Sequence, residues 1–209
     1  AGGTVNLSQG AEYTQPINLN LGALNVVQGQ VVTASGGIST TGGSIGGGGT
    51  LRLPAGQSMT LSGTTNLTVG GGTGAFENSG TVQNSGTGVL TVNPSQLVSN
   101  NATYTETSTG SLNISAASGT HSGTTTLSGN SINLGGTQTF NGPLALSGAG
   151  TKLNVVNGTA NLSQGASYSQ GITVDNGSLN VASGQTVSAA QSAAMNRSMD
   201  SLLTIPITT

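Results

Sequence analysis

The sequence predicts an all-β fold: a parallel β-helix, or β-solenoid, wound in three-sided coils of about 22 residues. The first observation behind this prediction is an internal repeat, because residues 3–34 and 158–189 match without a gap at 19 of 32 positions. The second is composition, since 36 of the 209 residues are glycine and only 4% are charged. Repeats of this kind are typical of architectures in which a coil buries its apolar side chains only when a neighbour stacks on it. Frequent glycine suits a chain that turns every few residues.

Short strands are predicted wherever two apolar residues stand two positions apart. That spacing places both side chains on one face of a strand, and successive pairs recur about every seven to nine residues. Three such steps make one coil, and each step ends in a Gly, Asn or Ser corner. Clear examples are Leu24 and Val26, Leu51 and Leu53, Leu90 and Val92, and Leu179 and Val181.

An antiparallel sandwich or barrel is the competing architecture, since it also has short strands at regular spacing. Its two-residue hairpins favour Asn-Gly and Asp-Gly turns. Such dipeptides occur only at residues 141–142, 157–158 and 176–177. Stacked coils also offer similar surroundings to the two repeat copies, which a sandwich does not. The solenoid is therefore the favoured prediction.

The last residues depart from this pattern, so we divide the chain into a solenoid domain, residues 1–188, and a tail, residues 189–209. No glycine follows Gly184. Residues 189–203 (AAQSAAMNRSMDSLL) are predicted to form a short helix with one apolar side. Residues 205–207 (IPI) should then run extended, because proline pushes the preceding residue out of the α region. The tail either caps its own last coil, as repeat arrays require, or is an arm that docks on a neighbouring molecule.

Charge and hydropathy exclude several classes of partner. The net charge is −2 with only three basic residues, so the chain has no electrostatic footprint for nucleic acid. No apolar run reaches the roughly 20 residues of a membrane-spanning helix. The chain has no cysteine and opens directly in the repeat pattern at Ala1, which we interpret as a mature N-terminus. We therefore expect no nucleic-acid partner and no membrane span. Cysteine-free chains rich in Gly, Ser, Thr and Asn resemble bacterial surface and secreted repeat proteins, and this resemblance implies a secreted, extracellular or cell-surface location.

The motif Gly-x-Leu-x-Val-x-x-Gly occurs at residues 22–29 and again at residues 177–184. Residues 1–188 resemble the β-helix of filamentous haemagglutinin-like and autotransporter-like bacterial surface proteins, both in this motif and in the style of the repeat. The resemblance implies secretion, an elongated parallel β-helix, and a role in adhesion or in a biofilm matrix. It implies no particular binding residue in this chain.

The sequence shows no constellation of catalytic groups, so we predict no catalytic residue, no cofactor site and no metal site. Residues 42–46 (GGSIG) match the nucleophile-elbow motif, but that motif needs a helix after the serine and a nearby histidine, and the only histidine is His121. The five acidic residues lie more than 20 positions apart, which leaves no paired carboxylates for glycoside cleavage. The Thr-x-Thr segment at residues 103–107 is typical of ice-binding arrays. Because such segments do not recur at a constant spacing in the sequence, we expect no ice-binding face.

The two ends of the solenoid are the expected functional sites. Each end of a β-helix exposes unpaired N–H and C=O groups, which are a template for further strands, and no charged residue precedes Glu12. We predict a non-enzymatic extracellular structural subunit that stacks head to tail on copies of itself into a filament. The alternative is the stalk or passenger segment of an adhesin that binds host or surface glycans. The predicted assembly contacts are apolar residues near both ends: Val5, Leu7, Leu179, Val181, Met195, Met199, Leu202, Leu203, Ile205 and Ile207.

Overall fold

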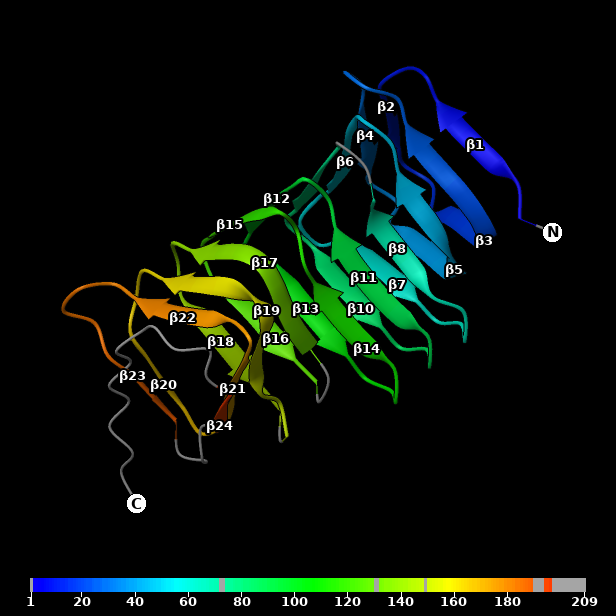
Figure 1. Cartoon of the computed structure of the whole chain (residues 1–209). Coiled ribbons are helices and arrows are strands. Elements are labelled where there is room, and N and C mark those ends of the chain that lie inside the picture. Colours follow the sequence, from blue (N-terminus) through cyan, green and yellow to red (C-terminus); the bar gives the residue numbers. More distant parts are fainter. Residues whose placement is uncertain (1, 72–73, 130–131, 149, 190–193, 197–209) are drawn as a thin grey trace.

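The computed structural model describes residues 2–71, 74–129, 132–148, 150–189 and 194–196, and this part of the chain has strands and turns but no helix. The strands stack as parallel coils along one long axis, with the N-terminal strands at one end and the last described strands at the other (Figure 1). There are about nine coils, about 21 residues apart. The predicted parallel β-solenoid is therefore confirmed.

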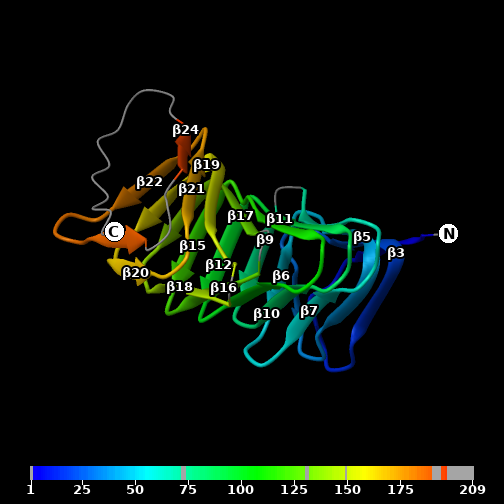
Figure 2. The same ribbon diagram turned by 90° about the horizontal axis from the view of Figure 1, so that it is seen from below.

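Each coil has three faces, and each face is a ladder of strands (Figure 2). The strands β3, β5, β17 and β19 bend around a corner and contribute to two faces. Face A contains β1 (Thr4–Leu7), the second halves of β3 (Ile17–Val26) and β5 (Ile38–Gly46), β8 (Leu67–Gly70), β11 (Val89–Asn93), β14 (Ser111–Ile114), the first halves of β17 (Ile132–Phe140) and β19 (Leu153–Leu162), β21 (Ile172–Asp175) and β24 (Ala194–Asn196).

Face B contains β2 (Ala11–Tyr13), β4 (Val31–Ala34), β6 (Thr50–Leu53), β9 (Ala75–Asn78), β12 (Gln96–Asn100), β15 (Ser118–Ser122), the second halves of β17 and β19, and β22 (Ser178–Val181). Face C contains the first halves of β3 and β5, β7 (Ser58–Leu61), β10 (Thr81–Asn84), β13 (Thr103–Glu106), β16 (Thr125–Ser128), β18 (Leu144–Ser147), β20 (Ala166–Tyr168) and β23 (Val187–Ala189). The last two strands pair with each other as a separate sheet, and Tyr168 Oη donates to the carbonyl of Leu144 at 3.0 Å, which ties this sheet to β18.

Inward apolar side chains form rows that run along the axis. On face A, residues from Leu24 (4% exposed) to Val174 (7% exposed) are register neighbours from one coil to the next. Such rows suit Val, Ile and Leu, which pack well on a pleated, half-buried surface. The row consists of Leu24, Ile45, Val69, Val92, Ile114, Leu134, Val155 and Val174.

The coils vary in length around the predicted value. Thr4 pairs with Ala23, 19 residues later, whereas Thr50 pairs with Ala75, 25 residues later. The strands keep their register despite these differences, so the extra residues are accommodated in the corners.

The predicted helix over residues 189–203 is wrong where the structure describes it. Ala189 ends β23 opposite Tyr168, and β24 pairs in parallel with residues 173–175. Helix propensities differ by only a few tenths of a kcal/mol between most residue types, whereas an open strand edge offers the backbone a full ladder of hydrogen bonds. Parallel pairing thus continues past residue 188. The other residues of the tail, including the predicted extended segment 205–207, lie outside the described residues.

The two repeat copies are separated by seven coils and one further face. β1 lies on face A, while its counterpart, residues 159–162, lies on face B. Their register is the same, because Thr4 and Thr159 each pair with a residue 19 positions later. Their surroundings differ: Val5 is 54% exposed, and its counterpart Ala160 is 0% exposed. The expected likeness therefore holds for coil geometry and fails for burial.

Candidate assembly ends

The N-terminal coil leaves one edge uncovered. Among the described residues, β1, β2 and the first half of β3 pair with a coil on one side only. Val5 is largely exposed, and Leu7, Tyr13, Ile17 and Leu19 are only partly buried against the core. This end therefore presents apolar side chains beside unpaired backbone groups, which together form a template for another strand layer.

Exposed apolar side chains concentrate near the same end. Of the five large apolar residues that are exposed in the described part of the chain, four lie between residues 5 and 31, and the fifth is Val98 on face B. In the second repeat copy, all four positions hold a smaller or polar residue, so this apolar surface belongs to the N-terminal copy alone. The four pairs are Val5 and Ala160, Leu21 and Asn176, Val27 and Ala182, and Val31 and Thr186.

Leu21 shows that the N-terminal copy retains an apolar residue against a conformational cost. Its φ is 56°, in the left-handed region, and its counterpart Asn176 has a φ of 48°. Asparagine tolerates this region, whereas a residue such as leucine is strained there by about 1–2 kcal/mol. Leu21 is also 48% exposed. A strained and exposed leucine points to a contact surface at this corner.

The apolar side chains at the C-terminal end are more deeply buried than those at the N-terminal end. No described strand pairs with the outer edges of β22, β23 and β24. Even so, Leu179, Val187 and Ala189 are only 5–6% exposed, and Val181 is partly buried. Most apolar residues of the last coil are thus covered, although Val181 is only partly buried, as Leu7 is at the first coil.

The structure places four of the ten predicted contact residues in coils at the two ends: Val5 and Leu7 on β1, and Leu179 and Val181 on β22. For Met195 only the backbone in β24 is described, opposite Val174. The sequence reasoning missed Leu21, Val27 and Val31, which a position-by-position comparison of the repeat copies identifies. Five predicted contacts lie outside the described residues: Met199, Leu202, Leu203, Ile205 and Ile207.

Outward asparagines link neighbouring coils at both ends. Asn25 Nδ2 donates to Asn6 Oδ1 at 3.0 Å, and Asn180 Nδ2 donates to Asn161 Oδ1 at 2.8 Å. These are equivalent positions of the two repeat copies, and in both the later residue donates to the earlier one. Among the described atoms, Asn6 Nδ2 and Asn180 Oδ1 have no hydrogen-bond partner. One end therefore offers an amide donor and the other an amide acceptor.

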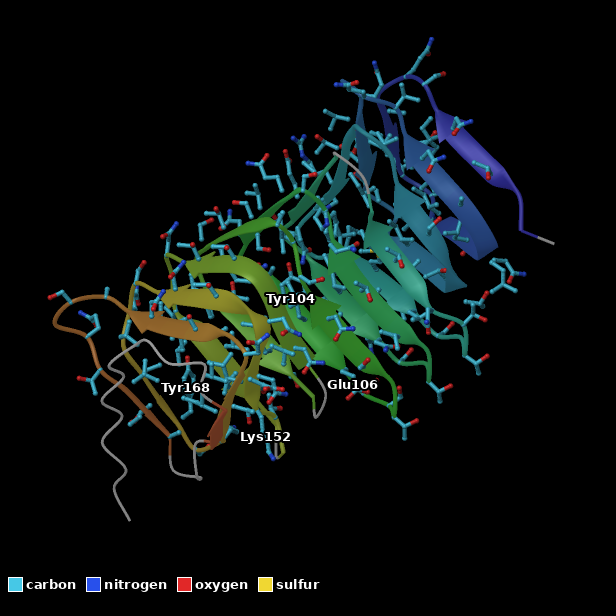
Figure 3. The ribbon with its side chains drawn as sticks, viewed as in Figure 1. Tyr104, Glu106, Lys152 and Tyr168 are labelled. Carbon is cyan, nitrogen blue, oxygen red and sulfur yellow. The ribbon has the colours of Figure 1, made fainter. Side chains whose placement is uncertain are left out.

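A buried polar cluster lies in the middle of the solenoid, around Tyr104 (Figure 3). Tyr104 Oη and Ser99 Oγ are 2.7 Å apart, and burial raises the pKa of this tyrosine. His121 Nε2 lies 3.1 Å from Gln138 Oε1, and the imidazole stacks on Phe140 with ring centroids 4.3 Å apart. All five side chains are buried, so the cluster takes part in the packing of the core.

The structure does not bring the residues of the GGSIG motif together with a histidine. Ser44 lies in β5 with its side chain on the outer side of face A, and His121 faces the core from β15 on face B. Among the described residues there is no group of three or more His, Asp or Glu that could hold a metal ion. No helix in the described residues is long and apolar enough to cross a membrane.

Single threonines recur from coil to coil on the outer side of face C, but the Thr-x-Thr segment does not, because Thr105 lies opposite Gln83 in one neighbouring coil and opposite Ser128 in the other. Thr81 pairs with Thr103, and Thr103 pairs with Thr126. The steps are 22 and 23 residues, and this small variation conceals the column in the sequence. A second surface feature is a groove of about 310 Å³ on face A, lined in part by Asn113 and Asn133.

No protein-family model, curated protein or solved structure matches this chain. The fold places it in the class of β-solenoid proteins.

Proposed function

We propose that the chain is a structural subunit that stacks end to end on copies of itself to form a filament. The observation that carries this proposal is the open N-terminal coil, where Val5 is 54% exposed beside unpaired strand edges. Natural proteins blunt such edges with charge, proline or a covering segment, and the only charge on this coil is Glu12. A head-to-tail contact that does not close into a ring generates an open filament.

An extracellular and non-enzymatic role is part of this proposal. It is supported by the resemblance of the cysteine-free, Gly-, Ser-, Thr- and Asn-rich repeats to bacterial surface β-helices. The adhesin alternative is supported by the groove on face A, where the amide groups of Asn113 and Asn133 and the hydroxyl of Thr91 line a concave surface that suits hydroxyl-rich ligands.

Val5→Asp is expected to suppress assembly without unfolding the monomer. The side chain is exposed in the isolated chain, so a carboxylate is tolerated there, but stacking would bury it without a partner. A penalty of about 3 kcal/mol would raise the concentration needed for half-assembly by about 100-fold. Analytical sedimentation and electron microscopy of the purified chain measure this concentration directly.

Val98→Asp is the matched control, because Val98 is 38% exposed but lies on the side of the solenoid, away from both ends. It should leave the half-assembly concentration unchanged. Equal assembly by the Val5 and Val98 variants would contradict stacking at the N-terminal coil. A wild-type chain that stays monomeric at all concentrations, yet binds glycans, would favour the adhesin alternative.

Deletion of residues 197–209 is expected to accelerate assembly. Leu179 and Val187 are already buried, so they have to be exposed before another coil can stack on β22 and β23. If these residues act as a cap, removing them shortens the lag phase seen by light scattering. Loss of assembly would instead show that the tail is a coupling arm, and an unchanged lag phase would contradict both roles.

A further inference from the structure

We infer that the filament join places β1 of one copy on β22 of the preceding copy, so that each subunit is turned by one face, a third of a turn, relative to its neighbour. This inference rests on the proposed end-to-end assembly and specifies its contact surface. The alternative is an unturned join, in which β1 continues face A by stacking on β24.

The winding of the chain favours the turned join. The last described coil runs from β22 on face B through β23 on face C to β24 on face A. Throughout the solenoid, a strand on face A is followed by one on face B. The next position along the same path therefore lies over β22, and β1 of the following copy occupies it once Leu179 is uncovered. Its β2 and the first half of β3 then cover β23 and β24.

The internal repeat already contains both halves of this contact. Residues 159–162, the counterpart of β1, pair with β22 so that Ala160 lies opposite Leu179. β1 itself pairs with the counterpart of β22, and Val5 lies opposite Leu24. A turned join continues this alternation without a change of register. The apolar row then runs from Ala160 and Leu179 of one copy to Val5 and Leu24 of the next.

The asparagine ladders are complementary across the same join. Asn180 donates to Asn161 through Nδ2, which leaves its Oδ1 without a partner among the described atoms, whereas Asn6 accepts from Asn25 through Oδ1, which leaves its Nδ2 without one. In the turned join, Asn6 of the next copy lies over Asn180 and its Nδ2 donates to that free Oδ1. The result is one ladder of four asparagines in which every hydrogen bond between side-chain amides runs in the same direction. Asparagine ladders of this kind stabilise stacked strands.

Cysteine pairs test the join directly, because the chain has no cysteine of its own. Neighbouring strands lie about 4.8 Å apart, within the Cα separation that a disulfide bridges. The double variant Asn6→Cys, Asn180→Cys is assembled under reducing conditions, checked by sedimentation and then oxidised. We expect a series of covalent oligomers on a non-reducing gel. Thr4→Cys with Ser178→Cys probes the same join while sparing the asparagine ladder, in case the first pair weakens assembly.

Three controls separate the possible outcomes. Asn6→Cys with Asn25→Cys should form a disulfide within one chain, and Asn6→Cys alone should form none. Covalent oligomers from Asn6→Cys with Asn196→Cys, and not from the Asn180 pair, would overturn the turned join in favour of the unturned one. Covalent dimers from Asn6→Cys alone would overturn it in favour of head-to-head pairing. Filaments that give no cross-link with either turned-join pair would also overturn it, while a wild-type chain that never assembles would refute the proposed function itself.

Discussion

Gly43→Ala is expected to lower the free energy of unfolding by about 3 kcal/mol or more. Gly43 stacks on Gly22 of the preceding coil, and a Cβ at position 43 would lie 2.1 Å from the carbonyl oxygen of Gly22. Its φ of 116° is also one that side-chain-bearing residues rarely adopt. Relief of the clash requires β3 and β5 to separate, which would break the hydrogen bonds between two coils.

Alanine substitutions at two other glycines separate the effect of the steric clash from the effect of the positive φ. Gly56 has a φ of 78°, but a Cβ added there would have no described atom within 4 Å, so Gly56→Ala should cost about 1 kcal/mol. Gly3 has neither constraint among the described atoms, and Gly3→Ala should change stability by less than about 0.5 kcal/mol. Urea unfolding followed by circular dichroism ranks the three variants. Equal midpoints for the Gly43 and Gly56 variants would contradict a steric role for the stacked glycines.

The period-two pattern of the sequence was sufficient to predict the architecture of the coils. Leu24 and Val26, for example, are two apart and are 4% and 1% exposed, as residues on one inner face should be. The local pattern does not determine where a corner bends without interrupting a strand, as in β3 and β17. It also does not determine the length of each coil, which is why the column of threonines on face C was not visible in the sequence.

The errors arose where burial or conformation depends on the neighbouring coil. Val5 has the sequence of an inward residue, yet it is exposed because no described coil lies beneath it. Ala194 and Met195 favour a helix locally, but they pair with the edge of β21. The second repeat copy begins on face B and not on face A because seven coils and one further face separate the two copies. This separation depends on the length of every coil in between, which the local sequence pattern does not determine. The apolar residue types at the two ends were therefore predictable, while the difference in their exposure was not.

Acid is expected to destabilise the solenoid through His121. The imidazole is 1% exposed, it stacks on Phe140, and Tyr104 meets it edge-on with ring centroids 6.4 Å apart. Nε2 donates to Gln138 Oε1, and Nδ1 has no hydrogen-bond partner among the described atoms. A proton on Nδ1 would place an unpaired charge in the core. Burial accordingly lowers the pKa of His121 from 6.5 to about 4, despite the hydrogen bond with Gln138.

The pH window follows from these two pKa values. Above pH 6.5 the histidine is neutral in the folded and unfolded chain, and its contribution to stability is complete. Between pH 6.5 and about 4 the unfolded chain binds a proton that the folded chain excludes, so stability falls. The loss from this residue reaches about 3 kcal/mol near the lower limit and then stops growing.

His121→Phe is the matched variant, since it keeps a ring against Phe140 and cannot be protonated. Loss of the hydrogen bond to Gln138 lowers the stability of the variant by an amount that does not depend on pH. The difference in free energy of unfolding between wild type and variant should therefore change by about 3 kcal/mol between pH 7 and pH 4. Urea unfolding of both monomers across this range measures that difference. A difference that stays constant with pH would mean that His121 takes up its proton inside the folded core, and the core would then have to solvate the charge.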